Sequence, residues 1–167
     1  MNGFDRVPLL VTLIAAGALA MLVPAMVALT QDDFATARPF GYAALLFLLF
    51  AIVLGLAAAT TQTGTGIRQL LVVLLVGFLG LPAMLAVPFA EAVPNTRFIN
   101  VYFEMVSSLT TTGATVFDPE RLPIAIHIWR GLVAWLGGFM MWIVAFALLA
   151  PMTLGGFEVT SVLEAGR

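Results

Sequence analysis

Residues 98–115 read FINVYFEMVSSLTTTGAT, and they fit neither an ordinary membrane span nor an ordinary loop. Its apolar residues recur at helical spacing, Thr96 or Asn100 can cap the start of a helix, and Gly113 can end it. The three resulting turns cover only about 20 Å at about 1.5 Å per residue, whereas the hydrocarbon core of a bilayer is about 30 Å thick. In a membrane, such a helix would enter the bilayer and the chain would return to the same side.

The sequence around this stretch indicates a membrane protein. Of the 167 residues, 62% are hydrophobic and 10% are charged, whereas a soluble domain is typically about a quarter charged. A helix needs about 20 apolar residues to span a bilayer, and four uncharged runs have that length: Val7–Thr30, Pro39–Ala59, Gln69–Ala90 and Gly131–Phe157. We therefore predict an all-α integral membrane protein with four transmembrane helices, near 7–30, 39–60, 69–90 and 124–151, and one re-entrant pore helix near 98–110.

Two features of the long runs have more than one interpretation. The first run could be a cleaved signal peptide, but it exceeds the about 7 to 15 apolar residues of a signal core, so a retained helix is the better interpretation. Small residues recur at four-residue spacing in the second and fourth runs, where they would allow close helix packing or simply reflect the alanine content of membrane helices: Ala51, Gly55, Ala59, Ala134 and Gly138.

The segment Thr110–Thr115 has the composition of an ion-binding loop. Irregular backbone is tolerated at membrane depth only where protein buries it or where it lines a water-filled cavity. Gly113 permits backbone angles that strain other residues, and threonine hydroxyls and backbone carbonyls are neutral oxygens that can replace the hydration shell of a monovalent cation. A plain surface turn has a similar composition, and Gly113 could serve only as a helix C-cap. The residues alone leave these interpretations open.

Glu104 and Arg130 are two ionisable residues beside or within apolar segments. Such groups are costly in or near a membrane unless they are paired. We interpret them as a structural salt bridge between the short helix and the fourth span. Exposure of either residue to water or to the membrane interface is the alternative, and it would make the pair weak.

Several landmarks between Val101 and Gly156 occur in an order shared with one transporter family. They are Phe103-Glu104, the run Thr110–Val116, Trp129-Arg130, Trp135–Gly138, and Pro151 with Gly155-Gly156. This part of the chain resembles the first helix–pore–helix repeat of the Trk/Ktr/HKT superfamily, and within it bacterial TrkH-type potassium transporters. One position departs from the family pattern, because Met140 stands where a glycine is usual.

The resemblance implies a selectivity filter formed by Thr111, Thr112, Gly113 and Ala114, with K⁺ bound at the first three, and with Glu104, Thr110, Thr115 and Arg130 supporting the filter. Glycine at position 113 implies a preference for potassium, since serine there is associated with sodium. The resemblance also implies that residues 1–66 form two accessory transmembrane helices, 67–157 the first pore repeat and 158–167 a cytoplasmic tail. The protein would be a multi-pass protein of a bacterial inner membrane with both termini in the cytoplasm.

The expected function is part of a potassium uptake transporter or channel that supplies one quarter of a selectivity filter. The alternatives are a non-conducting truncated or split-gene membrane subunit, and a four-helix scaffold in which the threonine run is only a loop. Expected partners are potassium ions, the lipid bilayer, the remaining pore repeats or other copies of the chain, and a cytoplasmic nucleotide-binding regulatory ring. We expect no enzyme activity, cofactor or nucleic-acid partner, because the chain has a net charge of −2, one histidine, and no phosphate-binding loop or metal-ligand cluster.

Overall fold

The computed structural model describes residues 9–58 and 67–149, and in these ranges every regular element is a helix. The expectations for Ala59, Pro151, Gly155-Gly156 and the tail 158–167 lie outside the described residues. The elements are α1 (Leu9–Ala20), α2 (Leu22–Thr30), α3 (Phe34–Ala58), α4 (Ile67–Ala92), α5 (Phe98–Leu109), the 3₁₀ helix η2 (Pro119–Arg121) and α6 (Ile124–Leu149).

The prediction of four helices long and apolar enough to span a membrane is confirmed. The four candidate spans have 21 to 25 residues, and each reaches the about 20 residues that a bilayer requires: Leu9–Thr30, Phe34–Ala58, Val72–Ala92 and Ile124–Phe146. The short helix predicted near 98–110 is α5, which ends at Leu109.

The first span is interrupted where α1 passes into α2. Pro24 has no N–H to donate to the carbonyl one turn earlier, which weakens the helix at that turn. Two hydrogen bonds continue the helical pattern across the break. They run from Met21 N to the Gly17 carbonyl (3.2 Å) and from Ala25 N to the Met21 carbonyl (3.3 Å). The two helices therefore act together as one span.

The second span begins earlier than predicted. We expected it to start at Pro39, but α3 starts at Phe34 and includes that proline. Asp33 is the reason: its Oδ1 accepts a hydrogen bond from Thr36 N (3.1 Å) and its carbonyl accepts one from Ala37 N (3.0 Å). An aspartate in this position satisfies N–H groups that lack a partner at a helix start, so the helix extends past the proline.

The bounds of α5 agree with prediction, but the residues that begin and end it differ from those expected. The residue before the helix is Arg97, which makes no side-chain cap bond, so neither Thr96 nor Asn100 caps it. The helix stops before Gly113, because Thr111 already has a left-handed φ of 56° and its N–H bonds to the Ser108 carbonyl at 3.0 Å. A left-handed residue ends a helix by turning the chain away from its axis.

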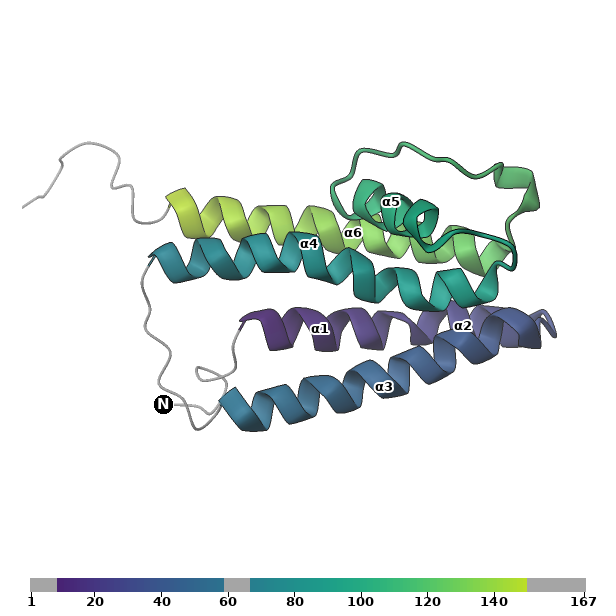
Figure 1. Ribbon diagram of the computed structural model, residues 1–167, viewed down its shortest axis with the longest axis horizontal. Helices are drawn as coiled ribbons and strands as arrows, with labels where there is room; N and C mark the ends of the chain where they lie inside the picture. Colours follow the sequence, from purple (N-terminus) through teal and green to yellow (C-terminus); the bar gives the residue numbers. More distant parts are fainter. Residues whose placement is uncertain (1–8, 59–66, 150–167) are drawn as a thin grey trace, which may run out of the picture.

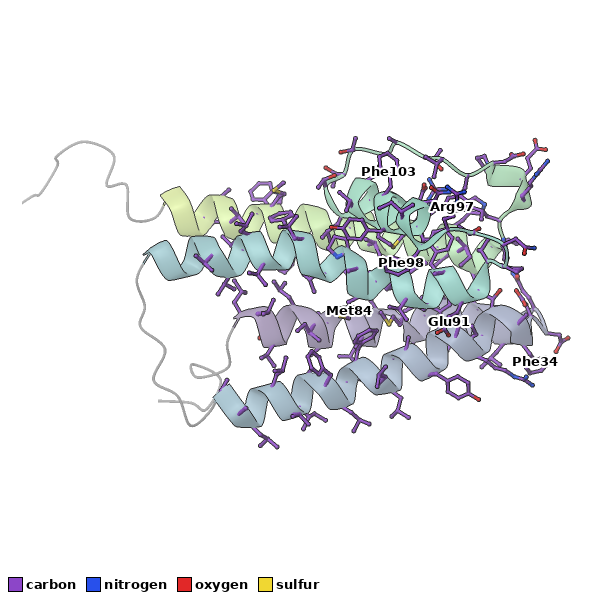
Figure 2. The ribbon with its side chains drawn as sticks, in the orientation of Figure 1. Phe34, Met84, Glu91, Arg97, Phe98 and Phe103 are labelled. Carbon is purple, nitrogen blue, oxygen red and sulfur yellow. The ribbon has the colours of Figure 1, made fainter. Side chains whose placement is uncertain are left out.

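The long helices lie side by side, and α5 packs against α4 and α6 at one end of the bundle (Figure 1). The chain leaves α4, forms α5 and enters α6 at this end, where the turn between α2 and α3 also lies. Ala125 near the start of α6 packs with Ala28 of α2 and Ala37 of α3, on either side of that turn. Glu91 and Arg97, both exposed, mark the same end where α4 passes into α5 (Figure 2).

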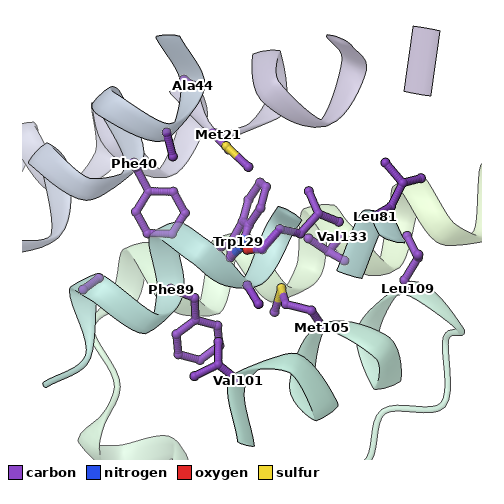
Figure 3. Packing of buried hydrophobic residues seen from close by; sticks show 14 of the residues in the cluster. Met21, Phe40, Ala44, Leu81, Phe89, Val101, Met105, Leu109, Trp129 and Val133 are labelled. Carbon is purple, nitrogen blue, oxygen red and sulfur yellow. Dashed lines mark hydrogen bonds between the residues drawn. The ribbon is translucent and has the colours of Figure 1, made fainter. Parts of the chain in front are cut away.

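A buried tryptophan joins the first two spans to the rest of the molecule. Trp129 of α6 is fully buried, and its ring meets that of Phe40 of α3 edge-on, with 5.4 Å between the ring centres (Figure 3). Such aromatic pairs contribute about 0.5 to 1.5 kcal/mol beyond the area they bury. Met21 of the first span lies against the same core.

Two prolines of α4 lie close to the hydrogen bonds that join this helix to α5 and α6. α4 contains prolines at positions 82 and 88, and proline distorts the helical hydrogen bonds of the turn before it. Tyr102 Oη donates to the carbonyl of Leu79 (3.1 Å) and Trp129 Nε1 to that of Leu85 (3.2 Å), each three residues before a proline. These bonds fix α5 and α6 to α4, and they show that Trp129 is a packing residue.

Candidate cation-binding loop

The loop after α5 contains two residues with left-handed backbone angles. Thr111 has φ 56° and Gly113 has φ 75°, both in the left-handed region. A threonine in this region is strained, because its side chain branches at Cβ. A Cβ added to Gly113 would meet nothing within 4 Å, so the backbone angle rather than lack of space favours glycine there.

Hydrogen bonds hold the loop against the end of α5. The carbonyl of Ser107 accepts bonds from Thr112 N (2.9 Å) and Gly113 N (3.4 Å). The Ser107 hydroxyl donates to the Ala114 carbonyl at 2.7 Å, and the hydroxyls of Thr110 and Thr112 lie 2.8 Å apart. The loop therefore has a defined conformation within a single chain.

Three consecutive carbonyls of the loop remain available to a ligand. Within the described part of the chain, the carbonyls from Leu109 to Gly113 accept no hydrogen bond, and those of Thr111, Thr112 and Gly113 lie beyond the C-cap of α5. The carbonyl of Ala114 accepts the Ser107 hydroxyl. Thr111 and Gly113 line an open cleft whose far wall includes Arg130 of α6. Chemically, these are neutral oxygens of the kind that bind a monovalent cation.

The predicted ion pair between Glu104 and Arg130 is present. Glu104 Oε1 lies 2.6 Å from Arg130 Nη2, and the glutamate side chain is fully buried while that of the arginine is 19% exposed. The other carboxylate oxygen, Oε2, accepts a bond from Val116 N at 3.2 Å. Among the described residues, Glu104 Oε1 has no well-aligned hydrogen bond, so its approach to Arg130 is mainly a charge contact. One buried carboxylate thus connects α5, the end of the loop and α6.

The close approach between α5 and α6 occurs at Gly137. A Cβ added there would lie 2.8 Å from Cα of Leu109 and closer still to its carbonyl group, so only glycine fits. The predicted small residue Gly138 instead faces Thr111, whose Cγ2 would be 3.9 Å from an added Cβ. The expectation that Ala134 and Gly138 allow the close approach is therefore wrong, because the rotation of α6 turns their neighbour toward α5.

Small residues of the second span do meet a neighbouring helix. Ala51 of α3 is buried, and a Cβ added to Gly55 would lie 3.6 Å from Val11 of α1, which is ordinary van der Waals contact. These two positions therefore lie at helix contacts, but a larger residue than glycine would fit at position 55, so the need for small residues there stays a prediction.

Two other residues near the loop are a histidine with a backbone partner and an exposed phenylalanine. His127 Nε2 lies 2.9 Å from the carbonyl of Pro119 and links η2 to α6. Phe103 is exposed on the outer side of α5 (Figure 2). In residues 9–58 and 67–149, no three His, Asp or Glu side chains come together as a metal site.

No protein-family model matches the chain. Curated relatives do: TrkH of Escherichia coli is 33% identical over 142 residues, which cover 83% of this chain and 29% of the relative. TrkH of Vibrio parahaemolyticus is 33% identical over 150 residues, covering 88% of this chain and 30% of the relative. TrkI of Halomonas elongata is 25% identical over 143 residues, covering 85% and 29%. Each relative is named as a Trk system potassium uptake protein, and the chain spans less than a third of its length.

Proposed function

This chain is homologous to Trk system potassium uptake proteins of the TrkH type, and from that relationship we propose that it forms one pore repeat of a potassium transporter. One observation carries the proposal. Three successive carbonyls, of Thr111, Thr112 and Gly113, have no hydrogen-bond donor in the described structure, and a buried ion pair holds their loop in place. Oxygens arranged in this way suit the exchange of hydration water for backbone carbonyls.

The proposed topology makes α5 a re-entrant pore helix. Its 12 residues reach about 18 Å at about 1.5 Å each, which is too short to cross about 30 Å of hydrocarbon. In support, the loop after α5 returns to the end of the bundle where α5 began (Figure 1). Single cysteines at Thr115 and Asp118 should react with an impermeant reagent from the same membrane side as one at Asp33. Reaction from opposite sides would contradict the re-entrant hairpin.

Potassium would bind to the carbonyls of Thr111, Thr112 and Gly113. The C-terminal end of α5 adds partial negative charge near this position, which favours a cation. Ala114, the fourth residue of the proposed filter, would keep its carbonyl on α5 and fix the chain behind the ion. Thr115 would support it locally, since its hydroxyl donates to the Phe117 carbonyl at 3.2 Å.

Gly113→Ser in a complete pore tests the function of the loop. Serine can adopt a left-handed φ only at a cost of about 1 to 2 kcal/mol, so the carbonyls around it should shift. We expect the ratio of potassium to sodium uptake to fall while cation uptake continues. Gly41→Ser, on α3 away from the cleft, where an added Cβ also meets nothing within 4 Å, is the matched control. An unchanged ion ratio in Gly113→Ser would remove this residue from the filter.

One chain supplies only one side of a ring of oxygens, so the proposal requires further repeats or further copies of the chain. Residues 1–66 would be accessory helices, 67–157 the repeat and 158–167 a tail facing the cytoplasm, where a nucleotide-binding ring could regulate the assembly. The membrane would be a bacterial inner membrane. The purified chain in vesicles should show no potassium flux above that of empty vesicles. Potassium-selective flux together with a tetrameric mass would instead make the chain a complete homotetrameric channel.

A further inference from the structure

The pore-facing loop depends on one buried serine that offers no oxygen to the cleft. Ser107 lies in the last turns of α5 with only 4% of its surface exposed. Its hydroxyl donates to the Ala114 carbonyl at 2.7 Å, and its own carbonyl accepts Thr112 N at 2.9 Å and Gly113 N at 3.4 Å. A single residue therefore binds the chain on both sides of Gly113.

Gly113 needs such a restraint because glycine has more backbone freedom than any other residue. Its φ of 75° is one of several angles that it could adopt at little cost, and no atom lies within 4 Å of its missing Cβ to limit rotation. Holding the amide before it and the carbonyl after it leaves the Gly113 carbonyl little room to turn. The same bond turns the Ala114 carbonyl toward α5 and away from the cleft.

We propose that Ser107 is a positioning residue that determines ion selectivity by fixing which loop carbonyls face the cleft. The proposal rests on the function proposed above. Glu104 anchors the same returning segment one turn earlier on α5, through Val116 N at 3.2 Å. Glu104 thus sets where the segment ends, and Ser107 sets the orientation of the peptide units beside Gly113.

The neighbouring residue offers a matched control. Ser108 is also buried, with 8% of its surface exposed, but its hydroxyl makes no hydrogen bond in the described part of the chain. Ser107→Ala removes the hydroxyl bond, and Ser107→Thr keeps a hydroxyl at the same position. Ser108→Ala removes the hydroxyl of a residue that lines the cleft and holds no backbone group of the loop. The three variants separate the bond from the loss of a polar atom in α5.

Amide hydrogen exchange of the 167-residue chain in lipid nanodiscs measures the restraint without requiring ion flux. We expect the amides of 110–117 to exchange about fivefold faster in Ser107→Ala, the factor that corresponds to one neutral hydrogen bond. Ser107→Thr and Ser108→Ala should exchange at the wild-type rate. Unchanged exchange in Ser107→Ala would overturn the proposal, and so would an equal acceleration in α1 to α4, which would mean general loosening.

Uptake by a complete pore that contains this segment provides the functional readout. Ser107→Ala should lower the ratio of potassium to sodium uptake by about fivefold if the lost bond had held the potassium geometry, and Ser107→Thr should restore the ratio. A wild-type pore that passes no potassium would contradict the proposed function, while the exchange result would still decide whether Ser107 restrains the loop. Faster exchange with an unchanged ion ratio would reject its role in selectivity.

Discussion

Replacing Gly137 with alanine should weaken the contact between α5 and α6. The new Cβ would lie 2.6 Å from the carbonyl carbon of Leu109 and 2.8 Å from its Cα, whereas ordinary contacts begin at 3.4 Å. Backbone atoms cannot rotate aside as a flexible side chain can, so α5 must retreat by more than about half an ångström. Overpacking of this kind typically costs about 1 to 3 kcal/mol.

Gly131→Ala is the matched control for this prediction, because an added Cβ at that position of α6 meets nothing within 4 Å. Both substitutions gain up to about 1 kcal/mol of helix propensity, so this gain cancels when the two variants are compared. Their free energies of unfolding should then differ by the overpacking cost alone, and unfolding midpoints shift by about 2 to 4 °C per kcal/mol for chains of this size. Thermal unfolding in detergent measures the difference. Equal midpoints for Gly137→Ala and Gly131→Ala would show that the helices do not approach closely at Leu109.

Two further sets of substitutions test the other attachments of α5 and α6 by the same unfolding measurement. Arg130→Gln should destabilise the protein by about 3 to 5 kcal/mol, since it leaves the fully buried Glu104 unpaired. Glu104→Gln should cost less, because the Arg130 side chain is 19% exposed and can reach water. The double variant should lose less than the sum, and additive losses would mean that the two side chains do not interact. Trp129→Phe keeps a buried ring but removes the N–H that donates to Leu85, which should cost about 1 kcal/mol, whereas Trp135→Phe changes an exposed ring and should cost almost nothing; equal effects of the two would contradict the hydrogen bond.

The sequence was sufficient for features that depend on length and on the cost of charge in a membrane. Four apolar runs of spanning length predicted four long helices, since nothing shorter than about 20 residues can cross a bilayer. The pairing of Glu104 with Arg130 followed from the penalty for an unpaired charge. The start of α3 is also readable from the sequence, because Asp33 carries the side chain that begins a helix six residues before Pro39.

Features that depend on the rotation and position of one helix against another could not be read from the sequence. Gly137 and Gly138 are adjacent glycines, so the sequence does not distinguish them. Only the rotation of α6 about its axis decides that Gly137, and not Gly138, meets Leu109. Ser107 lies on the buried side of α5 with Glu104, but a hydroxyl can bond to many backbone groups. Its bond to Ala114 depends on the path of the loop, which left-handed angles at Thr111 and Gly113 determine.

The two contacts between α5 and α6 together set the depth of the loop. Glu104 meets Arg130, and five residues later Leu109 meets Gly137, so the attachments are about 7 Å apart along α5. A helix held at one point can still slide or tilt, but a helix held at two separated points can do neither without breaking a charge contact or losing close packing. The loop begins directly after the second attachment. The position of its carbonyls relative to α6 is therefore fixed within this chain. In the proposed assembly of repeats, alignment of the α6 helices alone would bring these oxygens to a common level.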